Sequence, residues 1–241
     1  MEAPLSDRPA PQLATSVEKA PGGGEWLHEI KLDGYRVLLV VDGGAARLLT
    51  REGHDWSERF PGIVAAAAAL PVDSAVLDGE AVVLEPSGTS DFGSLQRALK
   101  GGVDAAVAHL FDLPYLDGHD LAGVPLEERK RALEMLLGAA HSDRLRYTDH
   151  IEGPREGILD HACELGVEGL VSKRRDARYA PGRSRAWLKS KCRRRQEFVV
   201  VGYTDPSGSR EGFGALALGY VDDFGELAYA GRVGTGFDER T

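Results

Sequence analysis

Apolar and polar residues alternate through EWLHEIKLDGYRVLLVV, residues 25–41, as they do in β-strands that bury one face. DGG at 42–44 is a hairpin turn signal that leads into ARLLTR at 46–51. The alternation returns in AVLDGEAVVLE at 75–85, and EPSG at 85–88 closes it with another turn. These runs predict strands that pair in antiparallel fashion.

Helical spacing of apolar residues repeatedly interrupts the strand pattern. The expected helices are 56–70, 92–100, 125–140 and 153–166, and the expected strands between them are 109–113, 145–149 and 168–173. Ser57 is the expected N-cap of the first helix, with Pro61 in its early turns. Hairpins mixed with single helices predict an α+β fold, with antiparallel sheets flanked by helices, rather than a repeated βαβ unit.

Composition divides the chain into three segments. Residues 1–24 are rich in Pro, Ala and Gly and end in PGGG, so we expect a flexible lead-in. Residues 25–195 hold the strands and helices described above. Residues 196–241 show short strands and frequent glycine turns, as at the start of a small β-barrel, but they are too few to close one. We therefore expect an incomplete barrel and interpret the chain as a fragment.

The bulk composition is that of a globular protein, with 42% hydrophobic and 28% charged residues in a chain of 241. No apolar run reaches membrane-spanning length and the N-terminus lacks a signal pattern, so we expect a cytoplasmic location. Cys163 and Cys192 are the only cysteines, and neither has a partner at metal-ligand spacing. We expect two reduced thiols, with neither a disulfide nor a zinc site.

The charge is unevenly distributed. The net charge of −9 argues against indiscriminate binding of nucleic acid. Residues 173–195, however, hold eleven Lys or Arg and one acid, Asp176, so this window carries +10 and the remainder carries −19. Such a window is either a solvated face or a surface that contacts phosphate.

Lys31 stands among acids, because strand alternation places Glu29, Lys31 and Asp33 on one face. Such a lysine is most often part of a surface ion pair. A nucleophilic lysine must instead be neutral, which requires its pKa to fall by ~3 from ~10.4, or roughly 4 kcal/mol, through burial and nearby cations. Gly34 permits a sharp bend that returns Arg36 toward the same place.

Three other segments carry paired charged residues. They are Asp78 and Glu80 around Gly79, Glu168 and Lys173 in VEGLVSK, and Lys189 and Lys191 in WLKSK. Gly79 leaves room for a ligand, and the two lysines of WLKSK share a strand face, as two ammonium groups gripping one phosphate would. Each pair alone is also typical of a solvated surface. The chain has no P-loop of the form GxxxxGK[ST], which weighs against an ordinary ATPase.

Six segments in order resemble the motif series of the covalent nucleotidyltransferases, the superfamily of ATP-dependent DNA ligases, RNA ligases and capping guanylyltransferases. They are KLDGYR, LLTREGHDW, VLDGEAVV, HLFDLPYLDG, VEGLVSKR and WLKSK. The residues between and around them are more similar still to the ligase domain of bacterial end-joining ligase D, notably in PQLAT, YAPGRSRAWLKSKCRRRQEFVVVGY and AGRVGTGF. The resemblance covers essentially the whole chain. It implies a nucleotidyltransferase (adenylation) domain followed by the start of an OB-fold.

The resemblance also implies a role for each matching residue. Lys31 would attack the α-phosphorus of ATP and carry AMP, while Lys189 and Lys191 grip the α-phosphate as further catalytic residues. Glu80 and Glu168 would bind Mg²⁺ or Mn²⁺, whose preferred ligands are oxygens. The residues implied to bind ATP or AMP are Glu29 and Phe111 at the adenine, Arg36, Arg51 and Glu80 at the ribose and phosphates, and Glu168, Lys173, Lys189 and Lys191.

Under this resemblance the basic window acquires a DNA-facing role. The candidates for phosphate contacts without sequence readout are Arg174, Arg175, Arg178, Arg183, Arg185 and Arg193, Arg194 and Arg195. The expected partner is nicked or broken double-stranded DNA in the bacterial nucleoid, with Ku and with polymerase and nuclease domains of the same native chain as further partners, and no membrane. AMP would pass to a DNA 5′-phosphate before the 3′-hydroxyl seals the nick.

Two kinds of alternative stay open. An RNA ligase or capping guanylyltransferase shares the motif chemistry, and a non-catalytic module could keep the nucleotide pocket as a scaffold surface. Because the family's final basic motif is not found after AGRVGTGF, we also expect this chain to bind or carry AMP but to seal nicks poorly.

Overall fold

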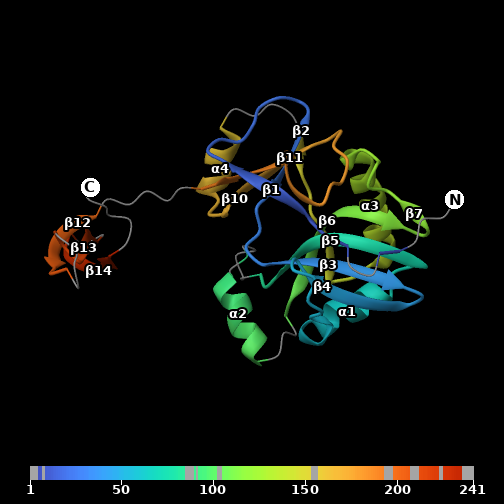
Figure 1. Ribbon diagram of the computed structural model, residues 1–241, viewed down its shortest axis with the longest axis horizontal. Coiled ribbons are helices and arrows are strands. Elements are labelled where there is room, and N and C mark those ends of the chain that lie inside the picture. The colour runs from blue at the N-terminus through green and yellow to red at the C-terminus, as the bar shows by residue number, and fades with distance from the viewer. Residues whose placement is uncertain are drawn as a thin grey trace. The chain divides into compact units, whose positions relative to one another are not determined.

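The computed structural model describes residues 5–6, 9–84, 90, 92–101, 105–152, 157–192, 198–206, 212–222 and 225–234 (Figure 1). The chain forms two compact units, Met1–Cys192 and Arg193–Thr241, divided close to the expected boundary after residue 195. Within the described residues no helix is long and apolar enough to cross a membrane.

Two sheets build the first unit. One has the order β1-β11-β10-β2-β9, in which the strands are Gln12–Val17, Gly182–Lys191, Gly169–Arg174, Trp26–Ile30 and Ile151–Glu152. The other has the order β4-β3-β5-β6-β7, with strands Ala45–Thr50, Tyr35–Asp42, Ser74–Val82, Val107–Leu116 and His119–Asp120, and β8 (Leu145–Tyr147) pairs with β6. The β1–β11 and β6–β8 pairs are parallel and the remaining pairs are antiparallel. The predicted α+β class is confirmed.

The hairpin expected at 42–44 joins β3 to β4, where Gly43 and Gly44 both have positive φ. The second unit is an antiparallel sheet of β12, β13 and β14, which are Val199–Thr204, Ala215–Val221 and Leu227–Val233. The turn expected at 85–88 lies outside the described residues.

The helices largely follow the predicted segments. They are α1 Pro61–Ala68, α2 Phe92–Gly101, α3 Leu126–Ala140 and α4 Ile158–Glu164, with a 3-10 turn at Ser57–Arg59. The N-cap prediction at Ser57 is wrong, because Phe60 precedes α1 and the Ser57 hydroxyl accepts a hydrogen bond from the Leu48 amide instead. Leu133 of α3 and Ile63 of α1 pack against the β3–β5–β6 sheet, where the main apolar core lies.

The expected loose lead-in is wrong for residues 12–17, which form β1. This strand pairs in parallel with β11, and its first residue, Gln12, is fully buried. The Gln12 carbonyl accepts a hydrogen bond from Arg36, and the Gln12 side chain accepts one from the Ala180 amide. These partners lie far away along the chain, so composition alone gave no sign of them.

The expectation of two free thiols is also wrong, because Cys163 and Cys192 form a disulfide. Cys163 lies in α4, which packs Ile158 and Ala162 against Leu170 of β10, and Cys192 directly follows β11, the neighbour of β10 in the sheet. Their separation of 29 residues along the chain is closed by this packing. Spacing along the sequence therefore could not reveal the pair.

Candidate active site

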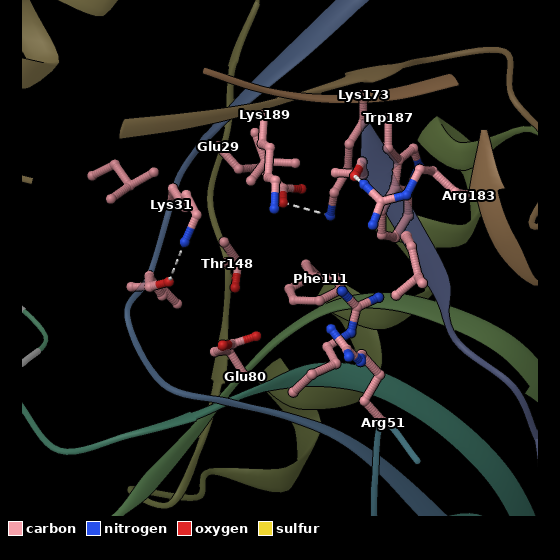
Figure 2. A pocket seen from close by; sticks show the side chains of 16 residues that line it. Glu29, Lys31, Arg51, Glu80, Phe111, Thr148, Lys173, Arg183, Trp187 and Lys189 are labelled. Carbon is pink, nitrogen blue, oxygen red and sulfur yellow. Dashed lines mark hydrogen bonds and ion pairs between the residues drawn. The ribbon is translucent and has the colours of Figure 1, made fainter. Parts of the chain in front are cut away.

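A pocket of about 240 Å³ opens between the two sheets of the first unit (Figure 2). Its walls come from β1, β2, β10 and β11 on one side and from β3, β5 and β6 on the other. Predicted site residues that line it are Glu29, Lys31, Arg36, Arg51, Glu80, Phe111, Lys173, Arg183 and Lys189. Most of the residues expected to bind a nucleotide are therefore brought together, although they are spread over more than 150 positions of the sequence.

Lys31 lies just beyond the end of β2, with its amide bonded to the Gly169 carbonyl at 2.8 Å. Its ammonium forms an ion pair with Glu168, and the other carboxylate oxygen of Glu168 lies 2.7 Å from the Lys191 ammonium. Lys31 also lines a second pocket with Glu168, so it separates two cavities. Lys31, Glu168 and Lys191 form the exposed cluster, in which the side chains are 18%, 25% and 60% exposed.

Glu29 forms a second cluster with two lysines. Its carboxylate oxygens lie 2.6 Å from Lys130 Nζ and 2.5 Å from Lys173 Nζ, and Figure 2 shows the second of these pairs. Glu29, Lys130 and Lys173, the buried cluster, are each no more than 3% exposed in their side chains. Burial would raise the pKa of Glu29, but the two ammonium groups lower it overall. Burial lowers the pKa of Lys173 to about 8.

Phe111 and Arg36 form the opposite wall. Arg36 makes a bidentate pair with Asp78, with both nitrogen–oxygen distances at 2.6 Å, and Tyr179 donates a hydrogen bond to the same carboxylate. The Arg36 guanidinium lies 4.6 Å from the centre of the Phe111 ring, and the Lys173 ammonium lies 3.8 Å from it. Phe111 therefore already contacts two cations, and it is 8% exposed.

Glu80 lies on β5 and faces the pocket, and burial raises its pKa to about 7 even though Arg36 and Lys31 oppose the shift. The sequence suggested that the neighbouring Gly79 leaves room for a ligand. That prediction is wrong. A Cβ atom there would lie 2.6 Å from the His109 carbonyl oxygen of β6, so glycine is needed for the close approach of two strands.

The two lysines of WLKSK share one face of β11, as predicted, but they have different surroundings. Lys189 lines the pocket, and its pKa is lowered by burial and by the charges of Lys31 and Lys191. Lys191 reaches Glu168, whose hydrogen bond raises the pKa of Lys191. Arg51 stands at the pocket edge, 57% exposed and paired with Glu52.

Fewer arginines of the basic window, residues 173–195, are available to contact DNA than its charge suggests. Arg174 is paired with Asp176 at 2.8 Å and Arg175 with Glu127 at 2.8 Å, because acids from the loop and from α3 lie beside them. Arg183 lines the pocket and donates a hydrogen bond to the Ala14 carbonyl at 2.7 Å. Arg185 and Arg178 are exposed, while Arg193, Arg194 and Arg195 lie outside the described residues.

The sequence did not reveal Trp187, Thr148 and the β1 residues, which line the pocket, or Lys130, which pairs with Glu29 behind it. Trp187 begins the WLKSK segment, where an uncharged side chain carries no signal of a phosphate site, and the centre of its ring lies 4.2 Å from the Lys173 ammonium. Lys130 stands in a helix rich in charged residues, EERKR, where nothing marks one lysine as buried.

The two expected metal ligands suit a divalent cation only in part. Glu80 and Glu168 lie close enough for each charge to affect the other, and carboxylate oxygens are the ligands that Mg²⁺ and Mn²⁺ prefer. Among the described residues no group of three or more His, Cys, Asp or Glu is arranged to hold a metal ion. The protein thus offers two carboxylates, and a bound cation would draw its other ligands from phosphate oxygens and water.

Comparisons with known proteins agree with this geometry. The family model of the ATP dependent DNA ligase domain matches residues 10–191. The multifunctional non-homologous end joining protein LigD of Pseudomonas aeruginosa is 48% identical over 238 residues, which cover 97% of this chain and 28% of that protein. The LigD protein of Mycobacterium tuberculosis (strain ATCC 25618 / H37Rv) is 41% identical over 97% of this chain and 30% of its own length.

Among solved structures, a mycobacterial DNA ligase D complexed with ATP and MES superposes with a TM-score of 0.69 at 38% identity, covering 96% of this chain and 74% of that chain. The ligase domain of M. tuberculosis LigD gives a TM-score of 0.68 at the same identity. The chain thus spans under a third of the length of the LigD relatives named above. These matches favour the DNA ligase interpretation over RNA ligases and capping enzymes, and the chain belongs to the family of ATP-dependent DNA ligase domains.

Proposed function

We propose that this chain is the catalytic domain of an end-joining DNA ligase and that Lys31 is its nucleophile. The observation that carries the proposal is the place of Lys31, which stands at the junction of two pockets with its ammonium against Glu168.

The first chemical step is the transfer of AMP to Lys31. The neutral amine attacks the α-phosphorus of ATP, a nitrogen–phosphorus bond forms, and the bond to pyrophosphate breaks. The amine must lose protons for this step, and the Glu168 carboxylate is within hydrogen-bond reach of them. Lys189 faces the pocket beside Lys31 and would offset negative charge as it develops on the phosphoryl oxygens.

The remaining residues would bind the nucleotide. Glu29 and Lys173 are buried in the pocket wall and would face the base, while Glu80 would meet the ribose. Arg51 and Arg183 stand around the same pocket and would contact phosphate. We thereby reassign Arg183 from DNA to nucleotide, on the strength of its position in the pocket wall.

A divalent cation would be held by Glu80 and Glu168, and when bound it would neutralise charge on the phosphates. For this to happen Glu168 must exchange at least one of its lysine partners for the cation, which its partial exposure permits.

In the later steps AMP passes to the 5′-phosphate of broken or nicked DNA, and attack by a 3′-hydroxyl releases AMP and joins the strands. Arg178 and Arg185 are exposed within the basic window and would contact DNA phosphates. End-joining relatives carry the name LigD, and we extend their role in non-homologous end joining to this chain, with Ku and other domains of the native protein as partners.

The test is incubation of the chain with α-labelled ATP and magnesium, followed by mass spectrometry for a covalent AMP adduct. We expect the wild type to gain the adduct on Lys31 and the Lys31→Ala variant to gain none. Lys19→Ala, which changes an exposed lysine away from the pocket, is the matched control and keeps the label. Equal labelling of wild type and Lys31→Ala would refute the assignment of the nucleophile.

A further inference from the structure

Lys130 is a buried lysine of α3 that contacts two residues of the pocket wall without lining the pocket itself. Its ammonium donates to Glu29 Oε1 at 2.6 Å and to the Thr148 carbonyl at 2.9 Å, and it lies 4.7 Å from the centre of the Tyr147 ring. The side chain is 1% exposed and does not line the pocket, whereas Glu29 does. Thr148 also lines the pocket, but Lys130 reaches only its main-chain carbonyl, so the side chain of this pocket that Lys130 contacts is that of Glu29.

The negative charge of Glu29 does not by itself account for the presence of Lys130 beside it. Lys173 already supplies one positive charge, 2.5 Å from Glu29 Oε2. With both lysines protonated the buried cluster carries a net charge of +1, and an excess charge in the interior is unfavourable unless something offsets it. The second lysine therefore adds something besides charge balance.

What it adds is a fixed carboxylate. Lys130 holds one oxygen of Glu29 and Lys173 holds the other, so rotation of the carboxylate would break at least one short contact. Each oxygen of an ionised carboxylate still has a lone pair for a further donor, and the group has no proton to donate. Glu29 is thus presented to the pocket as an acceptor in one orientation.

This presentation distinguishes adenine from guanine. Adenine carries an exocyclic amino group, a donor, where guanine carries a carbonyl oxygen, an acceptor. A fixed, ionised Glu29 can accept a hydrogen bond from the amino group, but it would set two acceptors against each other with guanine. A buried acceptor left without a donor is strongly disfavoured.

We propose that Lys130 is a positioning residue that sets the preference of this pocket for adenine over guanine nucleotides by holding Glu29 as an oriented, ionised acceptor. The proposal rests on the proposed function only in that Glu29 faces the base. It does not require covalent transfer to Lys31.

The experiment measures the dissociation constants of ATP and GTP by titration calorimetry for wild type and for Lys130→Met. Binding is measured separately from AMP labelling, so loss of labelling with retained binding counts against the nucleophile and not against Lys130. We expect wild type to prefer ATP and Lys130→Met to lose about tenfold of that preference, the effect of one charge-assisted contact. Lys130→Arg, which keeps a cationic donor, is expected to restore most of the preference.

Arg131→Met is the matched control, because Arg131 is the next residue of α3 and is 68% exposed. It should leave both dissociation constants unchanged. A purely structural role of Lys130 would lower stability and weaken both nucleotides equally, so a folded Lys130→Met protein with the wild-type ratio overturns the proposal. A wild type with no preference for ATP overturns it as well.

If Lys130→Met fails to fold, Lys130→Gln decides the question. Its amide is polar but uncharged, so the buried position keeps a hydrogen-bonding side chain while Glu29 loses one countercharge. We expect the ATP preference to fall in the same direction by roughly threefold or more. An unchanged ratio for this variant would overturn the proposal.

Discussion

The pocket is bordered by two ion clusters of the same composition, each made of one glutamate and two lysines. The buried cluster is Glu29, Lys130 and Lys173, and the exposed cluster is Glu168, Lys31 and Lys191. Side chains of the first are at most 3% exposed, and those of the second are 18% to 60% exposed. The two clusters therefore differ in access to water and not in chemistry.

Burial decides what each cluster is able to do. In the interior each charge needs its partner, because water cannot replace a lost contact, so the buried cluster holds one arrangement. Near the surface an ion pair contributes little to stability and its members can exchange partners. The exposed cluster is thus suited to a site where a lysine must leave a carboxylate to reach phosphorus, and the buried cluster is suited to recognition of a base.

The largest expected effect comes from removing the buried carboxylate. Glu29→Gln leaves two buried ammonium groups without a negative partner, and we expect the free energy of unfolding to fall by about 3 kcal/mol. Urea denaturation measures this directly, with an unchanged slope indicating that the folded state is otherwise intact. A loss below about 1 kcal/mol would show that the interior of this cluster is effectively hydrated.

A pH titration sharpens the comparison further. The pKa of Lys173 is lowered to about 8 by burial, against 10.5 for a lysine in water, so between these values the unfolded chain holds a proton that the folded chain has released. Stability should therefore rise with pH in this range, by about 2 kcal/mol from pH 8 to pH 10. Lys191 in the exposed cluster has a raised pKa, so its contribution is constant below pH 10 and is lost only above it.

Denaturation of wild type and Lys173→Met at several pH values isolates this effect. The difference in unfolding free energy between the two proteins should move in favour of wild type as pH rises from 8 to 10. A constant difference would mean that Lys173 keeps its proton throughout this range.

The smallest expected effect on stability comes from the exposed cluster. Glu168→Gln should change the free energy of unfolding by less than about 1 kcal/mol, because both of its pairs are partly solvated. The same variant should lower the rate of AMP labelling by about 100-fold, since Glu168 is within reach of the Lys31 protons. Equal losses of stability in Glu29→Gln and Glu168→Gln would remove the distinction between the clusters.

Local patterns predicted most of the fold. Alternation at 25–41 gave β2 and β3, and helical spacing at 125–140 gave α3 almost to its ends. Strand alternation and helical spacing both depend on residues that are close along the chain, so both can be recognised in the sequence. β1 and the Cys163–Cys192 disulfide were missed because each depends on β11 or on the residue that follows it. β11 lies far along the chain from Gln12, and Cys192 lies 29 residues from Cys163.

The site divides in the same way. The sequence determined which chemical groups are available, because the motif segments supplied the lysines and glutamates that line the pocket, and Lys31 among them. Only the tertiary structure decided which of these charges are buried and which residues they pair with. It places Lys130 beside Glu29, and it places Arg174 and Arg175 beside acidic side chains. The strength of an ion pair depends on its distance from water, and that distance is set by packing between segments that are remote in sequence.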